Sequence, residues 1–163
     1  MMGAIDARHF RNAMGEMPTG VTVITTSDEG GTPFGMTVSS FGSLSLDPPL
    51  VLWSVIETSY CMPVFAKSKA FAINVLAHDQ EVVSRVFCSP MDRFSHVAWN
   101  RGLHDSPLID GAAAWIECVR EKLARGGDHR IFIARVLNAR TFDRKPLLHW
   151  RGDYGSVTTM AQA

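Results

Sequence analysis

Cysteine is scarce in this 163-residue sequence, and its three copies, Cys61, Cys88 and Cys118, lie far apart. An odd number of cysteines at wide spacing fits neither a disulfide framework nor a zinc site. The histidines other than His129 show no metal-ligand spacing, so we expect no bound metal. Cys118 falls within an apolar strand pattern, which predicts a buried thiol rather than a nucleophile.

Long apolar runs and an excess of one charge are also missing. No run reaches the roughly 18–20 residues that a membrane-spanning helix needs, and residues 1–11 contain no apolar signal-peptide core. The 16 basic and 16 acidic residues cancel, which argues against binding nucleic acid or a membrane through bulk charge. We therefore expect a cytoplasmic protein that binds neither nucleic acid nor membrane.

The common nucleotide-binding and hydrolase motifs do not occur either. The chain has no P-loop and no Rossmann glycine fingerprint, so a nucleotide would have to bind through another fold. It also lacks a Gly-x-Ser-x-Gly elbow, which weakens the case for a serine hydrolase.

The patterns that are present predict one mainly β domain spanning residues 1–163. Helices are expected after Asp6 up to Pro18, over 60–67, and over 79–87 with Asp79 as N-cap. Residues 88–110 show little periodicity and are expected to form a long surface connection. The whole pattern favours an antiparallel barrel with peripheral helices. Apolar and β-branched runs predict strands at 21–26, 33–38, 50–56 and 70–76, a long hairpin at 114–140, and a short strand and turn at 146–154.

The hairpin carries the most informative segment, Gly126-Gly127-Asp128-His129. Two glycines can supply the positive φ that a tight connection needs. His129 could make a structural hydrogen bond, act as an acid or base, or contact a cofactor. Neighbouring strand residues point to opposite faces, so Asp128 is not expected to orient His129 unless the turn bends the chain.

Three further segments could contribute to a site. Thr37-Val38-Ser39-Ser40 could bind an anion or a polar ring, or its hydroxyls could satisfy nearby backbone groups. Ser45-Leu46-Asp47-Pro48-Pro49 could present backbone donors to a planar ligand, or simply be a stiff turn. In Asp92-Arg93-Phe94, the arginine could meet a phosphate and the phenylalanine could stack on a ring; a surface charge pair beside a half-buried aromatic is the simpler alternative.

Taken together, these segments resemble the short-chain flavin reductase family, in order and over nearly the whole chain. The resemblance implies a six-stranded antiparallel Greek-key split barrel with peripheral helices. It rests on Phe10–Gly15, Pro18–Val23, Gly35-Met36-Thr37-Val38-Ser39-Ser40-Phe41, Ser45–Pro49, Phe71–Leu76, Asp92-Arg93-Phe94, Gly127-Asp128-His129 and Pro146–Leu148.

The same resemblance implies a function. Family members use NADH or NADPH to reduce FMN or FAD, and many pass the reduced flavin to a separate monooxygenase. They are homodimers with the flavin near the subunit interface. His129 matches the family histidine beside the nicotinamide and flavin and is the implied catalytic residue. The implied cofactor-binding residues are Met36, Thr37, Val38, Ser39, Ser40, Ser54, Glu57, Ser59, Asp92, Arg93, Phe94 and Tyr154.

Some positions depart from the family pattern, and two other functions stay open. Ala134 stands where glycine is frequent, His149 where an aromatic is common, and Asp153 where a neutral or basic residue is common. The acid at position 153 leaves the choice between NADH and NADPH open. A flavin carrier or sensor could use the same fold; an oxidase of small amines is disfavoured because no cationic phosphate cluster is evident.

Overall fold

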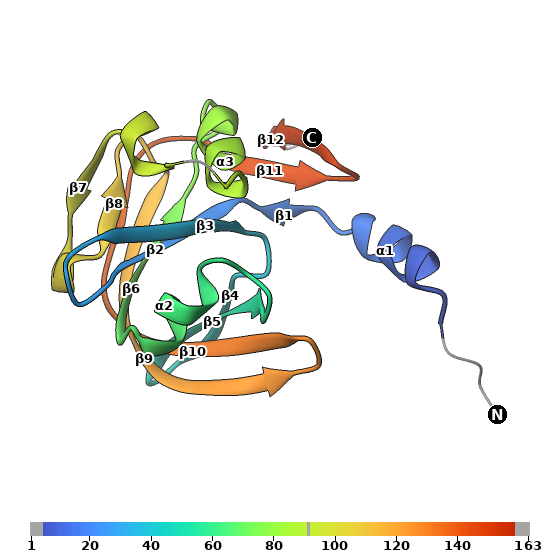
Figure 1. The fold of residues 1–163 in the computed structure, drawn as a ribbon. Coiled ribbons are helices and arrows are strands. Elements are labelled where there is room, and N and C mark those ends of the chain that lie inside the picture. Colours follow the sequence, from blue (N-terminus) through green and yellow to red (C-terminus); the bar gives the residue numbers. More distant parts are fainter. Residues whose placement is uncertain (1–4, 91, 159–163) are drawn as a thin grey trace.

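The structure, a computed structural model, describes residues 5–90 and 92–158 (Figure 1). The predicted domain limits, residues 1 and 163, lie outside the described residues. The mainly β prediction is confirmed, and every strand pair of the described chain is antiparallel.

The elements follow the predicted order closely. In chain order they are α1 (Ala7–Gly15), β1 (Thr19–Gly20), β2 (Thr22–Ser27), β3 (Pro33–Val38), β4 (Gly42–Leu46), β5 (Pro49–Ile56), α2 (Met62–Lys67), β6 (Ala70–Val75), α3 (Glu81–Cys88), η1 (Phe94–His96), β7 (Trp99–Arg101), η2 (Leu103–Asp105), β8 (Pro107–Ile109), β9 (Ala114–Gly126), β10 (His129–Thr141), β11 (Leu147–Trp150) and β12 (Asp153–Ser156).

The main sheet has the order β3-β2-β6-β9-β10-β5-β4. β6, β9 and β10 are consecutive neighbours, and β5 lies beside β10 rather than beside β6. This is the strand order of a Greek key. Six of the seven strands in this sheet were predicted, and the edge strand β4 was not. β4 and β5 are joined by Asp47-Pro48, so the proline-rich segment is a tight turn.

The prediction of a surface connection over 88–110 is wrong in part. The segment contains two short strands, β7 and β8, and residues 106–109 are buried. Buried polar side chains from the main sheet hold it in place. The Asn74 Oδ1 atom accepts from the Ile109 backbone N–H at 2.7 Å, and a Glu117 carboxylate oxygen accepts from the Leu103 N–H. These long-range bonds leave no local pattern in the sequence.

The two predicted helix caps have different outcomes. Asp6 caps α1 as expected, and its carboxylate accepts from the backbone N–H groups of Arg8 and His9 at 3.0 and 2.9 Å. Asp79 does not cap α3, because the N-cap position is Gln80. The Asp79 carboxylate is instead paired with Arg144. No helix in the described residues is long and apolar enough to cross a membrane.

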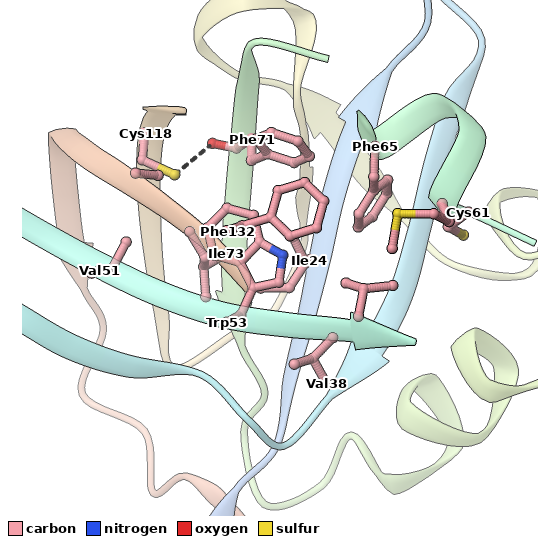
Figure 2. Packing of buried hydrophobic residues seen from close by; sticks show 13 residues of the cluster. Ile24, Val38, Val51, Trp53, Cys61, Phe65, Phe71, Ile73, Cys118 and Phe132 are labelled. Atoms are coloured by element: carbon pink, nitrogen blue, oxygen red, sulfur yellow. Dashed lines mark hydrogen bonds between the residues drawn. The ribbon is translucent and has the colours of Figure 1, made fainter. Parts of the chain in front are cut away.

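Aromatic rings from four elements fill the barrel (Figure 2). Trp53 of β5 stacks on Phe132 of β10, with ring centroids 5.2 Å apart and planes 6° from parallel. Phe71 of β6 and Phe65 of α2 meet these rings edge to face. Cys118 lies in the same core, where its thiol donates to the Phe71 carbonyl. The side chain is 2% exposed, which confirms the predicted buried cysteine, and burial raises the pKa of the thiol to about 12.

A second core lies between α3 and the sheet. Phe87 of α3 packs there with Val21, Val23 and Ile109. An added Cβ at Gly35 of β3 would lie 2.8 Å from the Phe87 ring. Only glycine permits this close packing of α3 on β3.

We predict that one thiol per chain reacts quickly with a disulfide reagent at pH 8. The thiolate is the reacting form, and burial raises the pKa of both Cys61 and Cys118, whereas Cys88 is exposed. Titration of the native protein, then of the denatured protein, measures the fast and total thiols. Cys88→Ser should remove the fast reaction, and a fast reaction that survives in this variant would contradict the arrangement of the core.

Candidate functional site

Several of the predicted site residues lie on the second half of β3 or contact it. Thr37 faces α3, where its Oγ1 donates to the Ser84 carbonyl at 2.7 Å. The Met36 sulfur accepts from the Ser59 hydroxyl at 3.7 Å. Val38 is buried in the barrel core. The strand is therefore held on both faces before its polar end reaches solvent.

The end of β3 meets β5 through a pair of serines. The Ser40 hydroxyl donates to the Ser54 carbonyl at 3.1 Å and accepts from the Ser54 N–H at 3.0 Å. Ser39 is exposed. The hydroxyls of Thr37 and Ser40 thus satisfy backbone groups, as the simpler interpretation of this segment expected. Each hydroxyl oxygen keeps acceptor capacity for a ligand.

His129 begins β10 directly after a two-residue turn. Only Gly127 of the two glycines has positive φ, at 66°, which is the pattern of a turn with glycine at its first central position. Asp128 lies in this turn and not on a strand. Its Oδ1 is 2.7 Å from the His129 Nδ1, so the exception that the sequence prediction left open applies, and Asp128 does orient His129. The turn bends the chain, and strand alternation does not apply to Asp128.

The Asp128 carboxylate fixes how His129 presents its ring. The hydrogen bond to His129 lowers the pKa of Asp128, which keeps the carboxylate ionised. An ionised carboxylate only accepts hydrogen bonds, so Nδ1 carries the shared proton and Nε2 is left for a ligand. The imidazole is about 40% exposed and is accessible.

Glu57 lies beside this turn, but its carboxylate is already paired. Its backbone N–H donates to the Asp128 carbonyl at 2.9 Å, which ties the end of β5 to the turn. Arg130 donates to its carboxylate at 2.7 Å, and this bond lowers the pKa of Glu57. Glu57 therefore presents a neutralised ion pair to the site.

Arg93 is held by the protein through three acceptors. Its guanidinium donates to the Gly35 carbonyl at 2.6 Å, to the Ser89 carbonyl at 2.8 Å and to the Cys61 sulfur at 3.2 Å. Phe94 packs edge to face on Phe87, with centroids 5.1 Å apart. The guanidinium thus pins β3 to two other segments.

Tyr154 reaches the same region from the C-terminal strands. Its hydroxyl lies 2.9 Å from the Ser84 hydroxyl, and the Arg85 guanidinium is 5.1 Å from its ring centroid. Ser84 is fully buried and links Tyr154 to Thr37 through α3. Sequence reasoning missed Ser84, since a serine inside an amphipathic helix carries no distinct signal.

In the described chain, different cavities are lined by different candidate residues. One cavity, of about 650 Å³, lies between the β2–β3 turn and α2 and is lined by none of the predicted residues. A second, of about 580 Å³, is lined by Ser39, His149 and the end of α1. A third, of about 340 Å³, is lined by Asp92, Arg93 and Phe94. No group of three or more metal-ligating side chains occurs within the described residues.

The same barrel occurs in solved oxidoreductases. The NADH:FAD oxidoreductase SgcE6 of Streptomyces globisporus, solved with NAD and FAD fragments, has this fold. It matches with a TM-score of 0.91 and 35% identity over 99% of this chain and all of that chain. The family model described as flavin reductase like domain matches residues 14–158. The chain belongs to the flavin reductase family.

Two curated relatives agree with this assignment. The chain is 44% identical to the FMN reductase (NADH) SmoA of Agrobacterium fabrum, over 94% of this chain and 87% of the relative. It is 43% identical to the reductase component of the flavin-dependent trigonelline monooxygenase of Acinetobacter baylyi, over 90% of this chain. In that second case the chain spans only 48% of the relative's length.

We predict that Arg93→Met lowers the free energy of unfolding by about 2–3 kcal/mol, because three acceptors lose a charged donor. Arg101→Met is the matched control. Arg101 is exposed and makes longer contacts, such as 3.5 Å to Asp105, so its loss should cost less than about 0.5 kcal/mol. Urea unfolding without flavin measures both variants; equal stabilities would show that Arg93 is not a structural pin.

Proposed function

We propose that this protein is an NAD(P)H-dependent flavin reductase that reduces FMN or FAD. The observation that carries the proposal is the position of His129, oriented by Asp128 beside the Ser40–Ser54 pair. Ile131, two residues along β10, pairs with Ser54 of β5. His129 is therefore about 7 Å along the strand from the polar end of β3.

The residues of this region fit a bound flavin. Hydroxyls and strand-end backbone groups at Ser39, Ser40 and Ser54 match the polar edge of an isoalloxazine ring. The Glu57–Arg130 pair is neutralised, so its carboxylate does not repel a phosphate. Met36, Val38 and Ser59 would flank the ring, and Asp92, Arg93 and Phe94 would close the site. Thr37 would hold the β3 end through Ser84.

The protein's own part in the reaction is to bind and orient. Flavin and nicotinamide supply the hydride chemistry when bound. His129 would position the nicotinamide through Nε2, with Nδ1 fixed by Asp128, and Tyr154 would face the nicotinamide nucleotide. Holding two rings in a reactive geometry can supply most of the acceleration that such an enzyme needs.

The proposal includes a partner and an assembly. The relatives named as monooxygenase reductase components support a separate monooxygenase that receives the reduced flavin. A homodimer is supported by α1, which extends away from the sheets (Figure 1). No residue of α1 is buried, and Phe10 and Met14 are 51% and 53% exposed. A second copy could cover this face. A cytoplasmic location follows from the supply of NADH there.

The first test mixes the purified protein with FMN or FAD and follows NADH and NADPH oxidation in air. We expect rapid oxidation that scales with added flavin. Flavin binding without nucleotide oxidation would favour a carrier or sensor, and neither binding nor oxidation would contradict the proposal.

We predict that His129→Ala lowers turnover roughly tenfold, because the nicotinamide loses a positioning contact, while the protein stays folded. Asp128→Asn should lower turnover less, since the ring remains but is held more weakly. His78→Ala is the matched control, because His78 is exposed and follows β6. The end of β6 pairs with the start of β9, which is the end opposite the β9–β10 turn. Turnover of His129→Ala equal to that of the control, at saturating and limiting NADH, would remove His129 from the mechanism.

A further inference from the structure

Tyr60 is unusual among the aromatic side chains because it is 75% exposed. It directly precedes Cys61, which is almost completely buried. Its ring stacks on Phe34 of β3, with centroids 6.2 Å apart and planes 29° from parallel. The Arg93 guanidinium lies 5.9 Å from the Tyr60 centroid. The protein thus supports this ring while leaving most of it open to solvent.

The ring borders the cavity of about 340 Å³ at the start of β3. Three of its walls are aromatic, from Phe34, Tyr60 and Phe94, which is the lining that planar ligands prefer. Arg93 also lines the cavity, and its Nε and Nη1 donate to Ser89, Gly35 and Cys61, which holds the guanidinium against the wall. The aromatic walls therefore suit a planar ring.

Two polar groups at the rim can complete the recognition of such a ring. The Asp92 side chain is exposed and makes no hydrogen bond or ion pair with any other described residue. Its carboxylate can accept from an exocyclic amine or a ribose hydroxyl. Thr32 lines the same cavity and has a hydroxyl that can donate or accept. Because Arg93 ties the walls together, little ordering is needed when a ligand enters.

The cavity also lies at a suitable place along β3. Phe34 is about 13 Å along the strand from Val38. Of the β3 residues proposed to flank the flavin ring, Met36 lies between these two positions, and the polar residues Ser39 and Ser40 follow Val38. A mononucleotide bound at the end of β3 has no adenosine group to reach Tyr60. An extended dinucleotide has an adenosine half that can reach it.

We propose that this cavity binds the adenine ring of a dinucleotide, stacked on Tyr60 with Asp92 and Thr32 at its polar edges. The inference rests on the proposed function, because the dinucleotide is either FAD or NADH. Both carry the same adenosine group, and the experiment distinguishes them.

The test compares Tyr60→Ala with Tyr60→Phe, which keeps the ring. KM is measured for FAD and FMN with saturating NADH, and then for NADH and reduced nicotinamide mononucleotide with saturating FMN. Loss of a base-stacking platform should raise the KM of the adenosine-containing ligand about 5- to 150-fold. An increase for FAD and not FMN assigns the cavity to FAD, and an increase for NADH and not the mononucleotide assigns it to NADH. If Tyr60→Ala changes neither ratio, the proposal is wrong.

A binding measurement keeps this test separate from the test of the proposed function. Calorimetry with ADP needs no turnover, so it decides the cavity even if the protein oxidises no NADH. We expect wild type and Tyr60→Phe to bind ADP alike and Tyr60→Ala to bind it at least fivefold more weakly. Equal ADP affinity in all three proteins, or no ADP binding by wild type, would overturn the proposal in that case.

Discussion

The arrangement of the site depends on the packing of four aromatic rings inside the barrel. Trp53, Phe65, Phe71 and Phe132 come from four different elements, and each ring contacts at least two of the others. Trp53 and Phe132 also face each other across paired strands, so their stacking sets the register of β5 against β10. That register places Ser54 and His129 on the same side of the molecule. Burial of such large rings is among the strongest stabilising contributions available to a domain of this size.

Most of the fold could be predicted from the sequence, because its strands are long, apolar and bounded by strong turn residues. β3 was predicted with its observed limits, and the hairpin at 114–140 was recognised from the glycines at its turn. The strand β4 was missed because Gly42–Leu46 is rich in serine and its side chains are largely exposed. β7 and β8 were missed because buried side chains such as Asn74 and Glu117, far away in the sequence, hold that segment. Local patterns carry no trace of such contacts.

The sequence named candidate site residues but not the contacts that they make. The resemblance selected residues that the fold brings around β3 and the β9–β10 turn. It gave no indication that Thr37 and Ser40 use their hydroxyls to hold neighbouring segments, or that Arg93 donates to Gly35, Ser89 and Cys61. In this protein the same polar groups build the scaffold and border the site. A substitution at such a position changes the stability and the binding surface together.

The β9–β10 hairpin also sets a length. His129 stands three residues from Phe132, whose ring is fixed in the core, so the distance from the core to the imidazole is about 10 Å of strand. Inserting one residue in each strand would turn His129 to the opposite face. Inserting two in each would restore the face but carry the imidazole about 7 Å farther from the barrel. The number of residues between Phe132 and His129 therefore fixes how far the imidazole stands from the core. That distance limits the space available to two stacked rings.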